Sequence, residues 1–185
     1  MVRIFTVEEV ERLKHYTRME PCGLMVRLIV NMGLRHAEVL DLRVGDYDFA
    51  ANRLRISGPN ARVPFVPEKM RFPLVRLIHG RDENGFIIST CPAGRRQLGA
   101  RTFQAYLNRV AEQLELDRLT VNNLRATCIV RFLEAGMDPR LIQKQMGIRA
   151  RKSITKYRGM LRKSILVGLP AVEPDFDLDR QVVAL

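Results

Sequence analysis

The chain has 185 residues, about the length of one ordinary globular domain, and its apolar and charged fractions of 46% and 28% exclude wholesale disorder. Lysine and arginine number 31 against 20 aspartates and glutamates, which gives a net charge of +11. This excess favours a polyanionic partner, nucleic acid first and an anionic membrane surface second. The three cysteines and three histidines are widely spaced, which argues against a disulfide scaffold and a metal-ligand motif.

No segment has the pattern of a membrane span or a signal peptide. The longest apolar stretch, 23–34, has 12 residues and contains Arg27, whereas a transmembrane helix needs about 20 apolar residues. The N-terminus has no continuing apolar run and no cleavage site. We therefore expect a cytoplasmic protein with no membrane partner.

The N-terminal half predicts helices followed by short strands. Thr6 and Glu9 form a capping-box pattern before apolar residues at helical spacing. Gly33 closes the buried segment that follows. The helices are expected at 7–17, 22–32 and 36–42, and the strands of one small antiparallel sheet at 47–49, 53–57 and 62–66.

Helical patterns resume after these strands and continue almost to the C-terminus. Helix starts are marked by Thr102, Thr120 and Asp138, and helix ends by Gly136, Gly147 and Gly168. The helices are expected at 67–78, 102–116, 120–135, 138–146 and 153–167, with a short apolar run at 86–88. The predicted fold class is mainly α with a small antiparallel β-sheet (α+β).

Charge divides the C-terminal part of the chain into two segments. Residues 140–163 contain nine basic side chains and no acidic one, whereas 164–185 contain four acids and one base. The basic run favours a nucleic-acid-binding face, and a solvated basic face is the alternative. We expect one domain over 1–168 and an acidic tail over 169–185 that is flexible or packs on a neighbouring subunit.

Three segments contain candidate functional residues. They are GLRHAEVL at 33–40, NNLR at 122–125, and MGI at 146–148, which Tyr157 follows nine residues later. Each has an ordinary interpretation by itself. Arg35 can be a surface charge, Arg125 a paired structural arginine, and Tyr157 a half-buried packing residue.

Together these segments resemble the catalytic domain of the tyrosine recombinase, or phage integrase, family, over a region from Phe5 to about Arg158. GLRHAEVLDLRVGDYD at 33–48 is similar to its first arginine box, and LEAGMDPRLIQKQMG at 133–147 to the segment between its second and third boxes. The resemblance implies that family's fold and DNA strand cleavage and rejoining through a 3′-phosphotyrosine, without metal or other cofactor. In this interpretation Tyr157 is the nucleophile. Arg35 and Arg125 bind the non-bridging phosphate oxygens, for which a permanently charged, planar fork is well suited.

The sequence departs from that family's pattern at three positions. Asn122 stands where the family has histidine, and it can donate a hydrogen bond but cannot transfer a proton at neutral pH. Ile148 replaces a histidine or tryptophan and can donate nothing. The expected hairpin turn has no lysine, and Arg62 is a poor acid in its place. Because acid–base help is worth about 10²–10⁴-fold, both an active and an impaired enzyme stay open.

Three functional hypotheses follow. The first is an enzyme that cleaves and rejoins DNA in site-specific recombination or integration, with Tyr157, Arg35, Arg125 and Asn122 at its active site. The second is a catalytically impaired homologue that acts as a DNA-binding module, and the third is a basic helical domain that binds RNA or acts as a regulator. The resemblance implies double-stranded DNA as partner, a homo-oligomer on that DNA, and no small-molecule substrate. The expected DNA-binding residues are Arg62, Arg149, Arg151, Lys152 and Lys156.

Overall fold

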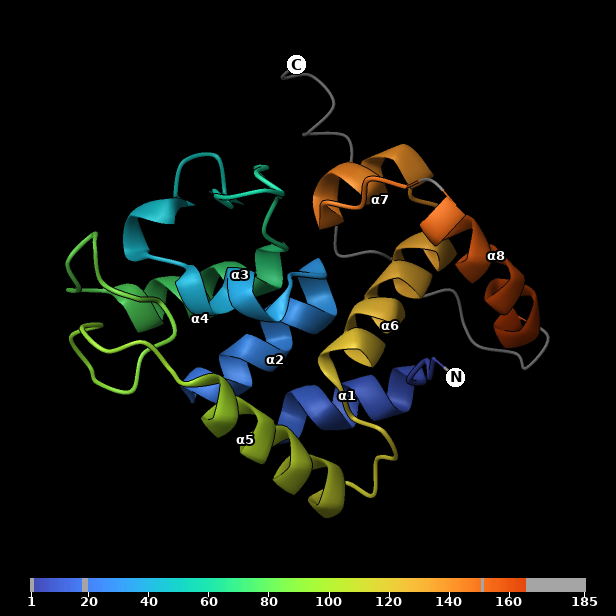
Figure 1. Cartoon of the computed structure of the whole chain (residues 1–185), viewed down its shortest axis with the longest axis horizontal. Helices are drawn as coiled ribbons and strands as arrows, with labels where there is room; N and C mark the ends of the chain where they lie inside the picture. Colours follow the sequence, from blue (N-terminus) through green and yellow to red (C-terminus); the bar gives the residue numbers. More distant parts are fainter. Residues whose placement is uncertain (1, 18–19, 151, 166–185) are drawn as a thin grey trace.

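Helix α2 (Pro21–Met32) lies at the centre of the fold, and all of its residues except Pro21 and Arg27 are buried. The computed structural model describes residues 2–17, 20–150 and 152–165. Within them, α2 packs against α1 (Val7–Tyr16), α3 (His36–Asp41) and α6 (Val121–Glu134) (Figure 1). A helix that is apolar on nearly every side is stable only when it is surrounded in this way.

Capping residues set several helix ends where the sequence predicts them. Thr6 and Glu9 form the capping box of α1, and Gly33 ends α2 in the left-handed region at φ +67°. Thr120 and Asp138 accept backbone hydrogen bonds at the starts of α6 and α7. The other helices are α4 (Glu68–Ile78), α5 (Ala100–Gln113), α7 (Pro139–Met146) and α8 (Lys152–Ile165), with a 3₁₀ turn η1 (Val44–Asp46).

The predicted start of α5 is wrong by two residues. Gly99 is the N-cap of this helix, and the backbone N–H of Phe103 donates to its carbonyl oxygen. Thr102 therefore lies inside the first turn. A threonine is a preferred N-cap, but glycine is also accepted at this position, and here Gly99 takes the extended cap conformation.

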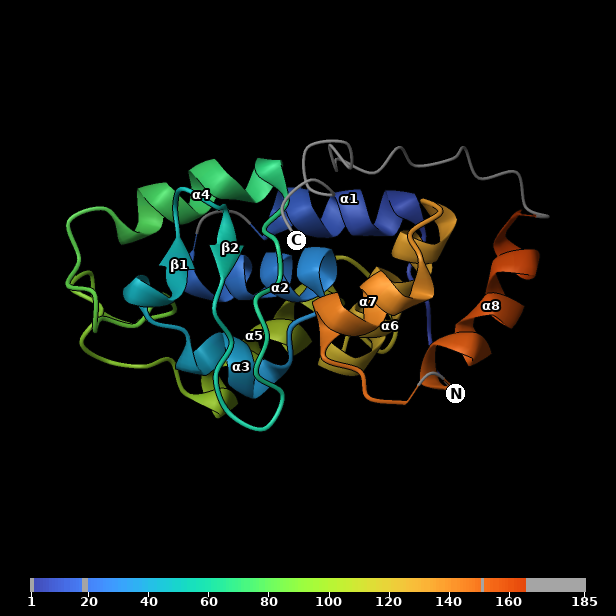
Figure 2. The ribbon, with the colours of Figure 1, turned by 90° about the horizontal axis from the view of Figure 1, so that it is seen from above.

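The sheet is smaller than the sequence predicts. Strand β1 (Tyr47–Asp48) pairs antiparallel with β2 (Arg53–Leu54) in the register Tyr47 to Leu54 (Figure 2). The expected third strand over 62–66 makes only isolated bridges to 53 and 56. Pro64 lies within it and has no N–H to donate, so a continuous ladder cannot form there.

Two apolar clusters form the core, and α6 contributes to both of them. Leu124 joins the larger cluster, which is built from α1 to α5 and the sheet. The segment 126–132 joins a second cluster with α7 and α8, which lies on the other side of α6 in Figure 1. No helix in the described ranges is long and apolar enough to cross a membrane. The expected domain boundary at 168 and the acidic tail 169–185 lie outside the described residues.

Candidate active site

Arg35 lies at the junction between two helices. Gly33 ends α2, and α3 begins at His36, so Arg35 is the N-cap of α3. Gly33 has a φ of +67°, and a Cβ atom there would lie 2.1 Å from Cε of Met146, so glycine is favoured at this turn. Arg35 Nη1 donates to Oε1 of Glu38 and Nη2 to the carbonyl oxygen of Gly147, both at 2.7 Å. The guanidinium is thus oriented from two sides while the side chain stays 31% exposed.

Arg125 reaches the same turn from α6. Its Nε donates to the carbonyl oxygen of Gly33 at 3.0 Å, two residues before Arg35. Burial and repulsion from the charge of Arg35 lower the pKa of Arg125. An arginine remains protonated at neutral pH despite such a shift, so two positive charges are held beside one another.

Glu38 and Arg62 form the buried part of this site. Arg62 Nη1 donates to Oε1 of Glu38 at 2.7 Å and Nη2 to Oε2 at 2.8 Å, while Nε donates to the carbonyl oxygen of Gln145 at 2.9 Å. The two side chains are 8% and 10% exposed. Burial opposes ionisation of Glu38, but the hydrogen bonds from Arg62 and Arg35 outweigh it and lower the pKa of Glu38 to about 2.

The three arginines differ in how many N–H groups they have left. A guanidinium has five donors. Arg62 makes four hydrogen bonds, to Glu38 twice, to Gln145 and to the carbonyl oxygen of Asn60. Within the described part of the chain Arg35 makes two through its side chain and Arg125 makes one. Arg35 and Arg125 therefore have N–H groups left with which to bind an anion. Three positive charges surround the single carboxylate of Glu38.

A shallow pocket of about 410 Å³ lies beside Arg35. Asn60, Gly147, Arg149 and Ser153 are among its lining residues. The hairpin over 53–66, which the bridges 53 to 65 and 56 to 62 close, therefore reaches the pocket together with the end of α7 and the start of α8. Exposed Arg149 crosses to the hairpin, where its Nη2 donates to the carbonyl oxygen of Pro59 at 2.6 Å.

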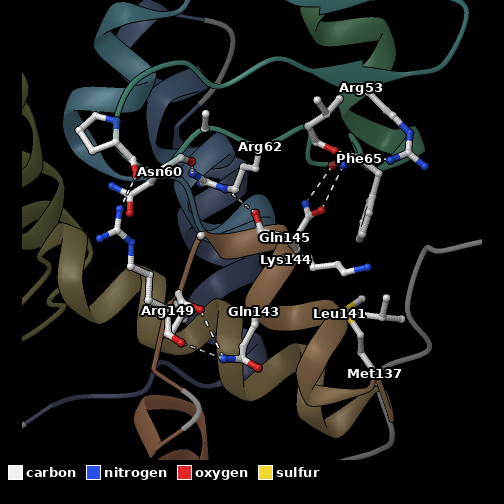
Figure 3. A pocket seen from close by; sticks show the side chains of 15 residues that line it. Arg53, Asn60, Arg62, Phe65, Met137, Leu141, Gln143, Lys144, Gln145 and Arg149 are labelled. Carbon is white, nitrogen blue, oxygen red and sulfur yellow. Dashed lines mark hydrogen bonds between the residues drawn. The ribbon is translucent and has the colours of Figure 1, made fainter. Parts of the chain in front are cut away.

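A larger pocket of about 660 Å³ adjoins this one, between the hairpin and α7 (Figure 3). Its lining is mostly apolar and includes Val63, Phe65 and Leu141. Arg62 and Gln145 lie between the hairpin and α7 at this point, with dashed hydrogen bonds joining the two segments. The two pockets share Asn60, Gly147 and Arg149, and basic side chains line both of them.

Tyr157 lies on α8 and packs into the second apolar cluster with 7% of its surface exposed. It makes no hydrogen bond to Arg35 or Arg125 in the described residues. Its hydroxyl is not among the buried polar atoms that lack a partner, so the fold does not leave this oxygen buried and unsatisfied. Ser153, one helical turn earlier and about 6 Å along the axis, lines the pocket beside Arg35.

The structure describes some of the remaining expected residues. Asn122 is exposed on α6, three residues before Arg125, and Ile148 packs against the second cluster. Exposed Lys156 places its Nζ 4.9 Å from the ring centroid of Tyr157. Arg151 lies outside the described residues, as does the side chain of Lys152.

The sequence did not assign roles to Glu38, Gly147 and Gln145, which orient the arginines. Glu38 follows Arg35 by three residues, which is the spacing of a capping box, and its carboxylate does accept from the Arg35 backbone N–H. Arg62 contacts Glu38, 24 residues earlier, and Gln145, 83 residues later, and no local pattern reveals either contact.

Residues 3–163 match the model of the phage integrase family, and the chain belongs to that family. The tyrosine recombinase XerC of Roseiflexus castenholzii is 30% identical over 133 residues, which cover 66% of this chain and 42% of that protein. The chain spans about half the length of the curated relatives it matches.

Solved structures show the same fold. A crystal structure of XerA recombinase superposes with a TM-score of 0.74 at 18% identity, over 93% of this chain and 65% of that one. The Tn1549 transposon integrase, in complex with a circular intermediate DNA, gives 0.72 at 16% identity, over 91% and 66%. The expected fold class, mainly α with a small antiparallel sheet, is confirmed.

Proposed function

We propose that this chain cleaves and rejoins DNA strands through a 3′-phosphotyrosine intermediate, in site-specific recombination or integration. Membership of the phage integrase family supports this function. The observation that carries it is the pair Arg35 and Arg125, which are held beside one turn with unused N–H donors. One phosphate with two non-bridging oxygens matches two such forks.

The proposed reaction needs one nucleophile and no external energy source. The hydroxyl oxygen of Tyr157 forms a bond to phosphorus, the bond from phosphorus to the 5′ oxygen breaks, and the phenolic proton leaves as the 5′ oxygen gains one. Arg35 and Arg125 stabilise the charge that develops on the equatorial oxygens. Rejoining reverses these steps, because the covalent linkage conserves the phosphodiester bond energy.

Proton transfer is the weakest part of this site. No histidine stands at position 122 to accept the phenolic proton. Lys156 contacts Tyr157 with its Nζ 4.9 Å from the ring centroid. Asn122 can contribute a hydrogen bond to the phosphate, whereas Ile148 contributes only packing.

Double-stranded DNA is the partner that this proposal requires. Arg149 and Lys156 are exposed near the site and are suited to phosphate contacts, as is the wider basic run 140–163. Copies of the chain would assemble on paired DNA sites. The second candidate function is a DNA-binding module with impaired cleavage, which the burial of the Tyr157 ring in an apolar cluster favours.

A covalent-trapping experiment separates these two functions. The chain is incubated with a pool of end-labelled nicked duplexes of random sequence, and adducts that resist detergent but not protease are counted. We expect adducts with the wild type and with Tyr16→Phe, an exposed tyrosine far from the site, and none with Tyr157→Phe. Salt-dependent binding without adducts would support the module, and adducts that persist in Tyr157→Phe would remove Tyr157 as the nucleophile.

A further inference from the structure

We infer that Arg62 is a positioning residue, which holds Glu38 and the Gly147 turn so that Arg35 is aimed at the phosphate, rather than a DNA contact itself. The inference rests on the proposed function, because it assigns an internal role within the same site. It also differs from the sequence-based expectation, in which Arg62 binds DNA.

The contacts of Arg62 join three segments that are distant in the sequence. Its guanidinium binds Glu38 on α3, the carbonyl oxygen of Gln145 at the end of α7, and the carbonyl oxygen of Asn60 in its own turn. Four of its five N–H groups are used in this way. The side chain is 8% exposed, so a phosphate in the adjoining pocket would find only one N–H group of Arg62 without a partner.

Arg62 and Arg35 meet through the carboxylate of Glu38. Oε1 accepts from Nη1 of both arginines, and Oε2 accepts from Nη2 of Arg62 and from the backbone N–H of Arg35. Four donors saturate the lone pairs of a carboxylate. Loss of Arg62 would leave half of these sites empty and free Glu38 to rotate, and Arg35 would then lose its fixed orientation.

A second set of hydrogen bonds fixes Arg62 in place. The side chain of Gln145, 3% exposed, accepts from the backbone N–H of Phe65 at 3.1 Å and donates to its carbonyl oxygen at 3.0 Å (Figure 3). Phe65 lies three residues beyond Arg62 in the hairpin. The hairpin and α7 are thus joined twice, and Arg62 lies at a defined distance from α3.

The charge balance gives Arg62 a second effect on Arg35. The single carboxylate of Glu38 has three arginines around it. They are Arg35 at the start of α3, Arg62 in the hairpin and Arg125 on α6. Without Arg62, Glu38 would offset one of the two remaining positive charges, those of Arg35 and Arg125, and a phosphate would gain less there. With Arg62 present, more positive charge is left over for an anion. Lysine cannot replace this function, because it has no planar fork that spans both Glu38 oxygens and the Gln145 carbonyl.

The salt dependence of DNA binding distinguishes a positioning residue from a phosphate contact. Removal of one phosphate-binding side chain reduces the slope of log affinity against log salt by about 1. We expect Arg149→Gln to reduce the slope by about this amount. Arg62→Gln should leave the slope at the wild-type value, as should Arg76→Gln, which removes an exposed charge on α4 and serves as the control. A slope reduced by about 1 in Arg62→Gln would overturn the inference.

A second arm uses inorganic pyrophosphate and needs no strand cleavage. We expect pyrophosphate to raise the melting temperature of the wild type and Arg76→Gln, and to raise that of Arg62→Gln and Arg62→Lys by less than half as much. A full response in Arg62→Lys would show that positive charge alone suffices, and a full response in Arg62→Gln would show that neither the charge nor the fork is needed. Either result would overturn the inference. No response in the wild type would overturn the inference together with the phosphate clamp.

The outcomes separate this inference from the proposed function. If the wild type forms no covalent adduct but the slope and pyrophosphate results are as expected, Arg62 positions a phosphate-binding site that does not cleave. If adducts form, we expect their rate to fall at least tenfold in Arg62→Gln with little change in DNA affinity. Should Arg62→Gln fail to fold, Arg62→Lys carries all three measurements.

Discussion

The guanidinium of Arg35 donates a hydrogen bond to the carbonyl oxygen of Gly147, 2.7 Å away and 112 residues further along the chain. Gly147 ends α7 in the left-handed region at φ +62°. A Cβ atom there would lie 2.8 Å from Nη1 of Arg62 and 3.2 Å from Nη1 of Arg35. The turn therefore depends on glycine for two reasons, its backbone conformation and the close approach of both side chains.

Gly147→Ala separates these two reasons when it is compared with Gly136→Ala. Gly136 also has a positive φ, of +76°, but a Cβ there would meet nothing within 4 Å. Both variants incur the left-handed strain of about 1–2 kcal/mol. We expect Gly147→Ala to cost about 1–3 kcal/mol more, from the displaced guanidiniums. Urea denaturation measures the difference, and equal losses would mean that the close approach is harmless.

Local signals in the sequence predicted the elements that position the arginines. The caps at Thr6, Gly33, Asp138 and Gly147 are all confirmed, because each depends on one residue and its immediate neighbours. The same holds for Arg35, which the Gly33 turn places at the start of α3. The predicted cap at Thr102 is wrong, because the helix begins earlier, with Gly99 as its N-cap.

Contacts between distant segments could not be predicted in the same way. Nothing around Arg62 indicates that Glu38 is its partner, because a hairpin side chain has no periodic relation to a residue on an earlier helix. A basic residue in a turn was therefore interpreted as a DNA contact. The sequence offers a half-buried packing residue as one interpretation of Tyr157, but which segments it packs against is a tertiary result, here the cluster formed with α6 and α7.

Glu38→Gln tests the buried ion pairs through the acid stability of the protein. The pKa of Glu38 is about 2 in the folded state against about 4.3 in an unfolded chain. A carboxylate with a lowered pKa stabilises the fold fully above pH 4.3 and loses this contribution as the pH falls toward 2. We expect the wild type to exceed Glu38→Gln by about 3 kcal/mol at neutral pH, and the gap to close below pH 4.

The control for that measurement is Glu112→Gln, which changes an exposed carboxylate on α5. Denaturant unfolding at pH values from 2.5 to 7 gives both curves. A gap between the wild type and Glu38→Gln that stays constant across this range would show that Glu38 has an ordinary acidity in the folded protein.

Lys14 predicts a second rise of stability with pH, on the alkaline side. Burial, together with repulsion from Arg131, lowers the pKa of Lys14 to about 8, although Glu11 accepts a hydrogen bond from its Nζ at 2.6 Å. The unfolded chain holds this proton up to about pH 10.4, so it binds more protons than the folded protein between pH 8 and 10.4. Stability rises with pH where the unfolded state binds more protons.

We therefore expect the wild type to gain up to about 3 kcal/mol relative to Lys14→Met between pH 8 and 10.4. Lys144→Met, which removes an exposed lysine, provides the comparison for charge alone. Unfolding in urea at several alkaline pH values is the measurement. Parallel curves for the wild type and Lys14→Met would contradict a lowered pKa for this amine.

Arg125→Lys tests whether the geometry of the second arginine matters or only its charge. Lysine keeps the positive charge but has no Nε–H to bind the carbonyl oxygen of Gly33, and it presents a single point of contact instead of a fork. Loss of one donor that stabilises developing charge typically costs about 10²–10³-fold in rate. We expect single-turnover adduct formation on the nicked DNA pool to fall by about that factor, with the exposed Arg101→Lys unchanged. If Arg125→Lys forms adducts at the wild-type rate, the phosphate does not bind between Arg35 and Arg125, and the active site lies elsewhere on the molecule.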